Sequence, residues 1–331
     1  MKTEIVSAQE CAKAVALLRA GETVALPTET VYGLAANALD PIAVAKIFEA
    51  KERPRFDPLI IHLPDRGWLA RVVDVRDEDR ELVKKLTDRF WPGPLTILLL
   101  KKTIVPEIVT AGLDTVAVRI SSHSVFARII ELFGNPLAAP SANRFGRTSP
   151  TTAQHVRDEL DGRTPLIVDA GPTSHGIEST IIGIRQGKIG ILRRGPITAE
   201  ELAEFGKIDI VAPTGNISAP GQLPAHYAPK TLLRLIDDAG TFMPAKSQRV
   251  ALLAWNAVED DKKFVAIRRL STSQNLRDAA ANLFRYLRDL DQSNVDLIVA
   301  ERVPEVGLGA AIMDRLRRAA HPPLNVQDTP E

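Results

Sequence analysis

The chain is almost without cysteine, since Cys11 is the single one among its 331 residues. Neither a disulfide within the chain nor a cysteine-rich metal site can form from one thiol. Such a composition is typical of a reducing cytoplasm, where we expect this protein to be. The six histidines show no metal-ligand spacing, so the sequence predicts no metal held by protein side chains.

Other absences narrow the class of protein further. A membrane span needs about 20 apolar residues, whereas the most apolar runs, such as residues 95–100, have the length of a strand. Glu4 stands where a signal peptide would need an apolar core. Because 42 Lys and Arg balance 41 Asp and Glu, no global charge attracts nucleic acid or a membrane. A strong anion site must therefore be a local arrangement.

Charged residues are absent from residues 210–229, a stretch that contains four prolines but no Asp, Glu, Lys or Arg. This composition is typical of an extended linker rather than of a packed element. The chain length favours two domains. The sequence therefore predicts a first domain at residues 1–208, a Pro-rich linker at 209–230 and a smaller domain at 231–331.

Strand-like and helix-like patterns alternate on both sides of this linker, which predicts an α/β fold for both domains. Expected strands are residues 23–28, 58–63, 95–100, 115–120, 136–142, 165–171, 231–236, 249–255 and 295–302. A hairpin is expected over residues 179–195, with its turn at Gln186-Gly187. A capping box of Ser7 and Glu10 predicts a helix that ends at Gly21. Further helices are expected at 40–51, 79–90, 198–206, 273–290 and 309–320.

Two glycine-rich stretches come close to familiar nucleotide motifs without matching them. Residues 171–178, GPTSHGIE, have the glycine spacing of a P-loop but lack its lysine. Residues 307–312, GLGAAI, lack the third glycine of a dinucleotide-binding fingerprint. We interpret the glycines at 307 and 309 as a tight turn.

Basic and hydroxyl side chains instead gather at the ends of the expected strands. The set comprises Thr28, Thr30, Lys51, Arg53, Thr115, Arg119, Ser141, Asn143, Arg144, Arg147, Ser149, Ser179, Thr180, Arg193 and Arg194. Arginine forks suit carboxylate and phosphate, whereas hydroxyl and amide groups suit ribose, phosphate or an amino acid. The set predicts a polyanion site without a single nucleophile, as phosphoryl or nucleotidyl transfer requires.

Six segments in order resemble one known family. They are LPTETVYGLAANA, KERPRFDPLIIHL, WPGPLTILL, TVAVRI, APSAN and GIESTII. Together they are similar to the YrdC-like domain of threonylcarbamoyl-AMP synthases. The segments HYAP, at 226–229, and GLGAAIMDRLRRAA, from residue 307, resemble the long, two-domain form of that family.

The resemblance implies a twisted, open mixed sheet with a basic cleft, followed by a smaller Rossmann-like parallel α/β domain. It implies an L-threonylcarbamoyladenylate synthase, a nucleotidyltransferase that uses L-threonine, bicarbonate or CO2, and ATP, and that releases pyrophosphate. The product would feed threonylcarbamoyladenosine formation on tRNA by a downstream transfer machinery. Mg2+ would arrive with the ATP triphosphate.

Site residues follow from the same resemblance. The Lys-x-Arg and Ser-x-Asn elements, expected to be catalytic and close to the nucleotide, are Lys51, Arg53, Ser141 and Asn143. L-threonine would contact Thr30, His62, Arg119, the backbone of Ala139, and Ser179. ATP would contact Arg53, Asp57, Thr115, Ser141, Ser149, Arg193 and Tyr227.

Asp57 departs from the family pattern, which usually has Asn there. An anion near phosphates is unfavourable unless it helps to hold Mg2+ or pairs with Arg55. The linker with Tyr227 is expected to close over the cleft, because water would destroy a carbamate intermediate. One alternative is an RNA-binding module that uses the same basic cleft, although aromatics are only 5% of the residues. Another is a regulatory small-molecule site in the second domain.

Overall fold

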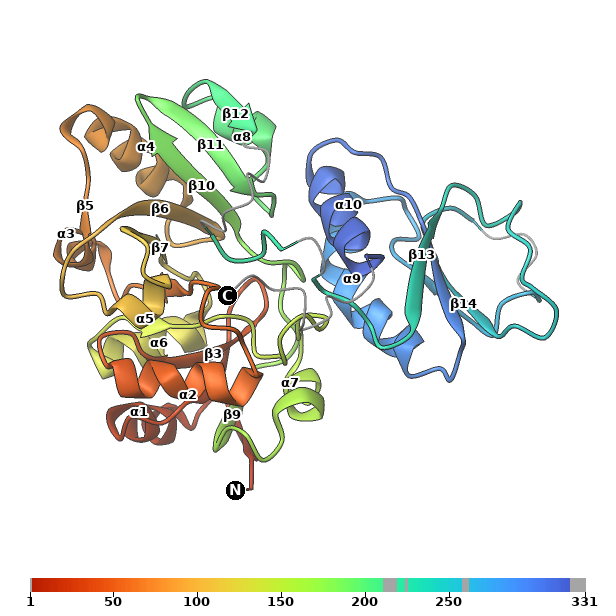
Figure 1. The fold of residues 1–331 in the computed structure, drawn as a ribbon, viewed down its shortest axis with the longest axis horizontal. Coiled ribbons are helices and arrows are strands. Elements are labelled where there is room, and N and C mark those ends of the chain that lie inside the picture. The colour runs from red at the N-terminus through yellow and green to blue at the C-terminus, as the bar shows by residue number, and fades with distance from the viewer. Residues whose placement is uncertain (1, 211–218, 224–225, 258–261, 322–331) are drawn as a thin grey trace. The chain divides into compact units, whose positions relative to one another are not determined.

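The structure, a computed structural model, describes residues 2–210, 219–223, 226–257 and 262–321. The chain divides into two compact units (Figure 1). Residues 1–145 and 150–222 form the first unit, and residues 146–149 and 223–331 form the second. Part of the expected linker, residues 211–218 and 224–225, lies outside the described residues. Within the described ranges, no helix is both long and apolar enough to cross a membrane.

The first unit is built on a 12-stranded mixed sheet with the order β1-β9-β2-β3-β8-β4-β7-β6-β10-β11-β12, and β5 pairs with β6. Its strands are β1 (Glu4–Ser7), β2 (Val24–Pro27), β3 (Tyr32–Asn37), β4 (Ile60–His62), β5 (Val73–Asp74), β6 (Leu95–Lys101), β7 (Thr115–Arg119), β8 (Leu137–Ala138), β9 (Leu166–Asp169), β10 (Thr180–Arg185), β11 (Lys188–Arg193) and β12 (Ile208–Ile210). The sheet contains parallel pairs, such as β4–β7, and antiparallel pairs, such as β6–β7, so the expected mixed sheet is confirmed.

Helices cover both faces of this sheet. They are α1 (Cys11–Arg19), α2 (Pro41–Lys51), α3 (Leu69–Val72), α4 (Arg80–Phe90), α5 (Glu107–Thr110), α6 (Ser124–Phe133), α7 (Ala153–Leu160) and α8 (Ala199–Ala203), with 3-10 turns η1 (Arg66–Trp68) and η2 (Asp77–Asp79). Alternation along β2 directs Val24 and Leu26 to the core shared with α1 and α6. Ala25 faces the larger core, which is shared with α2, α4 and α7.

Several sequence predictions are confirmed closely. Helix α2 begins after Asp40, whose side chain accepts hydrogen bonds from the backbone N–H groups of Ile42 and Ala43. The capping box of Thr198 and Glu201 is present at α8, although this helix ends at Ala203 rather than at 206. Gln186 and Gly187 both have positive φ, 52° and 69°, as a tight hairpin turn requires.

The capping box predicted at Ser7 is wrong. Ser7 ends β1, where it lies opposite Asp169 of β9. Helix α1 begins only at Cys11, and its N-cap residue, Glu10, makes no side-chain cap. Pairing with β9 therefore determines the conformation of Ser7, and a strand at 4–7 was not among the sequence predictions.

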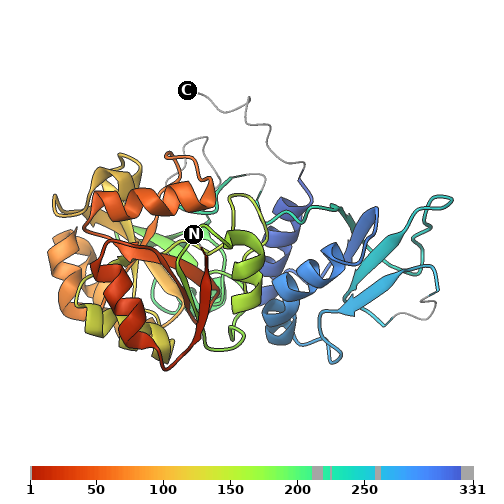
Figure 2. The ribbon, with the colours of Figure 1, turned by 90° about the horizontal axis from the view of Figure 1, so that it is seen from below.

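The second unit contains a four-stranded sheet with the order β13-β16-β14-β15, in which every pair is parallel. Its strands are β13 (Leu232–Ile236), β14 (Val250–Ala254), β15 (Ala266–Arg269) and β16 (Leu297–Glu301), and its helices are α9 (Leu276–Asp291) and α10 (Leu308–Ala319). Both helices lie on the same side of the sheet (Figure 2). The expected parallel α/β domain is thus confirmed, and β15 is a strand that was not expected.

Candidate functional site

One face of the first sheet carries side chains from several of the predicted site positions. Alternation along β7 places Thr115, Ala117 and Arg119 on one face, since every second side chain points the same way. His62 of β4 lies beside Arg119 in the parallel register, and His62 and Arg119 are both buried. Thr115 stands at the opposite end of this five-residue strand, so the face extends from Arg119 across Ala117 to Thr115.

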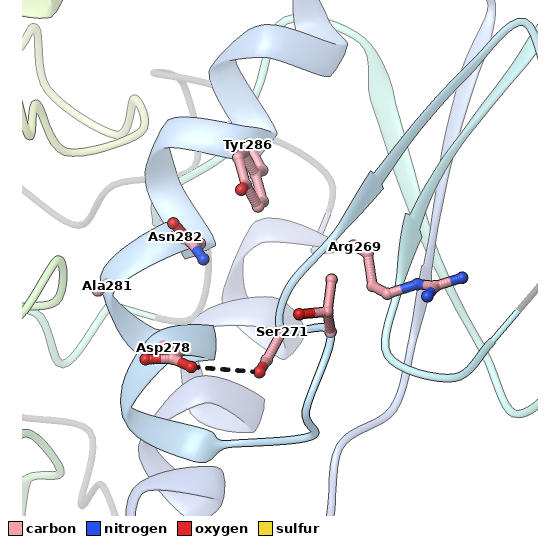
Figure 3. Close-up of a pocket in the computed structure, with 7 residues that line it drawn as sticks. Arg269, Ser271, Asp278, Ala281, Asn282 and Tyr286 are labelled. Carbon is pink, nitrogen blue, oxygen red and sulfur yellow. Dashed lines mark hydrogen bonds between the residues drawn. The ribbon is translucent and has the colours of Figure 1, made fainter.

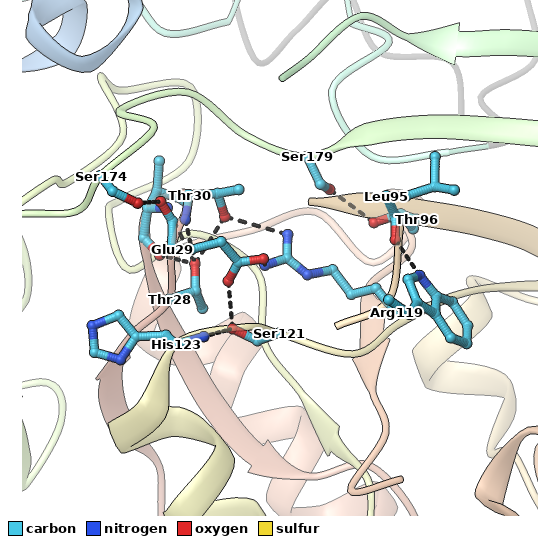
Figure 4. A network of polar contacts seen from close by, with 12 residues as sticks. Thr28, Glu29, Thr30, Leu95, Thr96, Arg119, Ser121, His123, Ser174 and Ser179 are labelled. Atoms are coloured by element: carbon cyan, nitrogen blue, oxygen red, sulfur yellow. Dashed lines mark hydrogen bonds and ion pairs between the residues drawn. The ribbon is translucent and has the colours of Figure 1, made fainter. Parts of the chain in front are cut away.

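The Arg119 guanidinium lies in a buried polar network at the turn between β2 and β3 (Figure 4). Its Nη2 is 2.8 Å from the Glu29 Oε1, and its Nη1 donates to the Thr30 Oγ1 at 3.3 Å. The Ser121 hydroxyl donates to the other oxygen of the Glu29 carboxylate. Burial lowers the pKa of Arg119, and the nearby Glu29 carboxylate opposes that effect. Arg119 is therefore held in place by an acid that the sequence predictions did not include.

The His62 imidazole is also buried, and its ring centroid lies 4.8 Å from that of Phe126 on α6. Burial first, and then the Arg119 charge, hold the pKa of His62 well below its usual 6.5. The ring hydrogen-bonds to the Leu137 backbone, while its Nδ1 has no hydrogen-bond partner among the described residues. Because the nitrogen that bonds Leu137 carries the proton of the neutral ring, the free Nδ1 can accept one hydrogen bond from a bound molecule.

Ser179, which precedes β10, links two further site positions. Its hydroxyl lies 2.8 Å from the Thr96 hydroxyl on β6 and accepts a hydrogen bond from the Arg193 Nη2 at 3.0 Å. The Arg193 Nε donates to the Ser179 carbonyl, also at 3.0 Å. The predicted threonine contact Ser179 and the predicted ATP contact Arg193 are therefore direct neighbours.

Lys51, at the end of α2, is 1% exposed, and its ammonium faces the loop after β8. The Lys51 Nζ donates to the carbonyl oxygens of Ser141 and Asn143, at 2.5 Å each. Burial first, and then the charge of Arg53, hold the pKa of Lys51 well below 10.5. Lys51 thus fixes the backbone of the Ser-x-Asn element, which makes it a positioning residue as well as a candidate phosphate contact.

Asp57 pairs with Arg53 and not with Arg55, which is the partner that the sequence analysis considered. The Arg53 Nη2 lies 2.9 Å from the Asp57 Oδ2, and both side chains are buried, whereas Arg55 is exposed. Burial raises the pKa of Asp57, against the opposing effect of Arg53, Lys51 and Arg193. Three basic side chains therefore act on one buried carboxyl, and two of them, Arg53 and Arg193, are predicted nucleotide contacts.

The backbone of Ala139 is already partly engaged. Its N–H donates to the Ile60 carbonyl at 3.1 Å, which leaves the carbonyl oxygen for a bound molecule. Ser141 forms an isolated bridge with Gly33 of β3, and the Asn143 side-chain amide donates to the Arg144 carbonyl at 2.7 Å. The first two contacts fix the segment after β8 to the neighbouring strands β4 and β3.

Ser149 and Tyr227, two predicted ATP contacts, belong to the second unit, whereas the other predicted site residues belong to the first. The Tyr227 backbone has a φ of 66°, and its carbonyl accepts a hydrogen bond from the Thr148 hydroxyl at 3.0 Å. The Tyr227 ring stacks on Phe284, with centroids 5.4 Å apart. Tyr227 is thus anchored within its own unit.

The second unit also contains a pocket of about 230 Å³ after β15 (Figure 3). Its lining residues are Arg269, Ser271, Thr272, Asp278, Ala281, Asn282 and Tyr286. The Ser271 hydroxyl donates to the Asp278 carboxylate at 3.5 Å, which marks the rim of the pocket next to the start of α9. None of these residues was among the predicted site residues.

Glu29 and Ser121 are the main site residues that sequence reasoning missed. Glu29 stands between two threonines that were selected, and the segment around it is otherwise apolar, which was the available indication. A carboxylate inside such a segment is rarely buried without a cation. Its partner Arg119 is 90 positions away, so the pairing itself could be found only from the fold.

The α/β fold and a buried face with arginine, hydroxyl and imidazole groups suit the class of proteins that bind an amino acid and a phosphorylated ligand. Residues 16–195 match the family model described as "Telomere recombination", which covers Sua5, YciO and YrdC proteins. Residues 197–321 match the model "Threonylcarbamoyl-AMP synthase, C-terminal domain". The chain belongs to the threonylcarbamoyl-AMP synthase family.

Similar proteins support this assignment over nearly the full length. The threonylcarbamoyl-AMP synthase of Pyrococcus abyssi is 40% identical over 324 residues, covering 93% of each chain. That of Bacillus subtilis is also 40% identical, covering 94% of this chain and 93% of the relative. The crystal structure of P. abyssi Sua5 complexed with L-threonine matches with a TM-score of 0.86 at 37% identity, covering 96% of this chain and 98% of that chain.

Proposed function

We propose that this protein is an L-threonylcarbamoyladenylate synthase, which converts L-threonine, bicarbonate or CO2, and ATP to threonylcarbamoyl-AMP and pyrophosphate. The observation that carries the proposal is the buried face on which Arg119, His62 and Ser179 adjoin Arg193. This arrangement offers an amino-acid site next to an anion site. The family membership and the L-threonine complex of the P. abyssi relative support the same activity.

L-threonine binds at the Arg119 end of the face. The Arg119 guanidinium receives the carboxylate, because an arginine fork matches a carboxylate in charge and in shape. The hydroxyl of the substrate reaches the free Nδ1 of His62. Thr30, Ser179 and the Ala139 carbonyl complete the site around it.

ATP binds where Arg53, Asp57 and Arg193 gather, next to the Ser141–Asn143 loop that Lys51 holds. Thr115, at the other end of the same face, and Ser149 and Tyr227 of the second unit are further proposed contacts. Mg2+ enters as part of the substrate MgATP, since the described residues contain no group of three His, Cys, Asp or Glu side chains that could hold a metal. The Asp57 Oδ1, which lacks a hydrogen-bond partner among them, is the carboxylate oxygen that could approach this ion.

Catalysis is a matter of alignment and charge neutralisation. The ammonium of threonine loses a proton, and the resulting amine adds to the carbon of CO2 and loses a second proton to solvent, which gives a carbamate. A carbamate oxygen then attacks the α-phosphorus of ATP, and the bond from this phosphorus to the pyrophosphate oxygen breaks. When the site holds both reactants in line, a bimolecular encounter in solution is replaced by an effectively intramolecular step. Arg53 and Arg193 stabilise the negative charge that develops on the phosphate.

The linker protects the intermediate from water. Its described residue Ala219 is fully buried against Ile60, Ala117 and Ile181, and the Pro220 carbonyl accepts a hydrogen bond from the Arg193 Nη1 at 3.4 Å. Ile60 and Ala117 lie on the same face as His62 and Arg119, so Ala219 covers that face. We extend this to a lid that includes Tyr227. Truncation before residue 210 should abolish turnover, and a truncated chain with full turnover would exclude the lid.

The product is a reactive acyl-adenylate, so a downstream acceptor must consume it. A tRNA threonylcarbamoyl-transfer machinery is the proposed consumer, and weak RNA binding by the chain itself is proposed to assist the transfer. The cytoplasm is the proposed location, since ATP and this acceptor are both found there.

The test is a turnover assay with ATP, L-threonine and bicarbonate, in which each substrate is omitted in turn. Pyrophosphate release should require all three, and the adenylate should be found by mass spectrometry. Release of ADP and free phosphate, or no turnover together with salt-dependent RNA binding, would instead favour an RNA-binding module.

A further inference from the structure

The buried pair of Arg119 and Glu29 has more hydrogen-bonding capacity than the chain uses. Arg119 is 2% exposed and Glu29 is 5% exposed, and their charged groups approach to 2.8 Å. Even so, the Arg119 Nη2 and the Glu29 Oε1 contact each other as an ion pair without hydrogen-bond geometry, and the Arg119 Nε has no hydrogen-bond partner among the described residues. Buried polar atoms are rarely left in this state, so this ion pair requires an explanation.

Glu29 is fixed firmly enough to act as a rigid part of a site. Its backbone carbonyl accepts hydrogen bonds from the Ser174 hydroxyl at 3.1 Å and from the His175 N–H at 2.9 Å. Its second carboxylate oxygen accepts from the Ser121 hydroxyl. The hydroxyl groups of its neighbours in the turn, Thr28 and Thr30, are hydrogen-bonded to each other, with 2.8 Å between their oxygens. The carboxylate therefore keeps one oxygen beside Arg119 without being able to swing away.

His123 also faces Glu29 but does not replace Arg119 as its cation. Burial holds the pKa of His123 below 6.5, although Glu29 opposes this effect. Burial therefore disfavours the charged form of the ring. The site offers one positive and one negative group side by side, each with unused capacity: donors on Arg119 and an acceptor on Glu29.

On the basis of the proposed function, we propose that Glu29 binds the α-ammonium of the substrate while Arg119 binds its carboxylate. The pair then selects a zwitterion, namely an amino acid with a free amine. A simple carboxylic acid satisfies Arg119 but leaves the Glu29 oxygen without a donor and places two negative charges close together. A simple amine satisfies Glu29 but leaves the guanidinium donors unused. Glu29 is thus a specificity-determining residue rather than only a support for Arg119.

Two fragments of threonine test this selection in the unaltered chain. β-Hydroxybutyrate is threonine without its amine, and isopropanolamine is threonine without its carboxylate. By calorimetry, each should bind at least about tenfold more weakly than L-threonine, since a hydrogen bond to a charged group is lost in each case. If β-hydroxybutyrate bound as tightly as L-threonine, the proposed role of Glu29 would be wrong.

The variant Glu29→Gln then assigns the effect to one residue. It keeps the shape of the side chain and removes its charge. L-threonine should bind at least about tenfold more weakly, while β-hydroxybutyrate should bind as well as before or better, because the repulsion has gone. The matched control is Glu131→Gln on α6, the same change at an exposed carboxylate that pairs with Arg128, and it should keep the preference for threonine over β-hydroxybutyrate.

The outcomes separate this inference from the proposed function. If the unaltered chain binds no L-threonine at all, the proposed function fails. If it binds L-threonine and Glu29→Gln changes neither the affinity nor the preference, only the role of Glu29 fails. If Glu29→Gln does not fold, the fragment measurements on the unaltered chain still decide.

Discussion

Lys51 illustrates how one residue can hold the site together. Its ammonium donates to the carbonyls of Ser141 and Asn143, and these atoms lose their donor in Lys51→Met. We expect the free energy of unfolding to fall by about 1–3 kcal/mol, the cost of leaving buried acceptors unsatisfied. The KM for ATP should rise at least about tenfold, because a displacement of the loop by about 1 Å is enough to cause an effect of this size. Urea denaturation and turnover kinetics measure the two effects.

The matched control for Lys51 is Lys46→Met on the same helix. Lys46 pairs with Glu22 at 2.7 Å, but both side chains are more than a third exposed to solvent, at 35% and 37%. Exposed pairs contribute only about 0–1 kcal/mol, so this variant should behave like the unaltered chain. If Lys51→Met left the free energy of unfolding unchanged and weakened only the binding of ATP, Lys51 would act on phosphate directly and not through the loop.

His62 makes stability depend on pH in a predictable direction. Its folded pKa lies well below 6.5, so below pH 6.5 the unfolded chain takes up a proton that the folded chain does not. The free energy of unfolding should therefore fall as the pH is lowered, by up to about 1.4 kcal/mol per pH unit for this group. His62→Gln should reduce this slope in urea denaturation between pH 7 and pH 5.

At the scale of single residues, sequence reasoning could find Arg119, His62 and Ser179 because their motifs are local. It could not find the contacts of Glu29 or the loop that Lys51 holds. Lys51 and Ser141 are 90 positions apart, and the chain meets there only because β3, β8 and β4 are neighbours in the sheet. The residues were therefore predictable, whereas the partners that fix them were not.

At the scale of elements, the end of β11 and the start of β10 approach unusually closely. A Cβ on Gly195 would lie 2.4 Å from the Thr180 nitrogen and 2.6 Å from the Glu178 carbonyl oxygen. In Gly195→Ala the backbone at Ser179 must therefore move. Overpacking of this kind costs about 1–3 kcal/mol. We expect that loss in urea denaturation, together with a raised KM for L-threonine.

Gly183→Ala, on β10 itself, is the control for this approach. A Cβ there would meet its nearest atom, the Leu192 Cδ1, at an ordinary 3.6 Å. This substitution should be neutral or slightly stabilising, since Ala has less freedom than Gly in the unfolded chain. Equal losses in the two variants would show that glycine in this hairpin matters for a reason other than the approach at Ser179.

Elements with a strong local pattern were predictable, and short ones that depend on a partner were not. Helix α2 has its Asp40 cap and Pro41 in the sequence, and β6 is a continuous apolar run. Strand β3, YGLAAN, contains glycine and small residues, which disfavour strands, and it forms because β2 and β8 pair with it. Helix α6 was missed although Phe126, Ile129, Ile130 and Phe133 have helical spacing, so in that case the pattern was present.

At the scale of the whole molecule, each unit has a core of its own. The core of the second unit includes Val250, Leu252, Val299 and Phe264, all from residues after 223. The segment from residue 307 belongs to this unit and begins with the tight turn that the sequence predicts, in which Gly307 has a φ of 52°. Gly309 follows at the start of α10, where a Cβ would lie only 1.7 Å from the Pro304 carbonyl oxygen.

Gly309→Ala therefore tests the second unit with an informative sign. Inside a helix, Ala is normally about 1 kcal/mol more favourable than Gly. The collision with Pro304 reverses this, so the variant should destabilise the second unit. Amide hydrogen exchange should become faster in β13–β16 and α9, with β2, β4 and β7 of the first unit as the internal reference. Gly240→Ala, where the nearest atom is the Asp238 side chain at 3.1 Å, is the milder control. Slower exchange in Gly309→Ala would mean that helix propensity, not the close turn, decides this position.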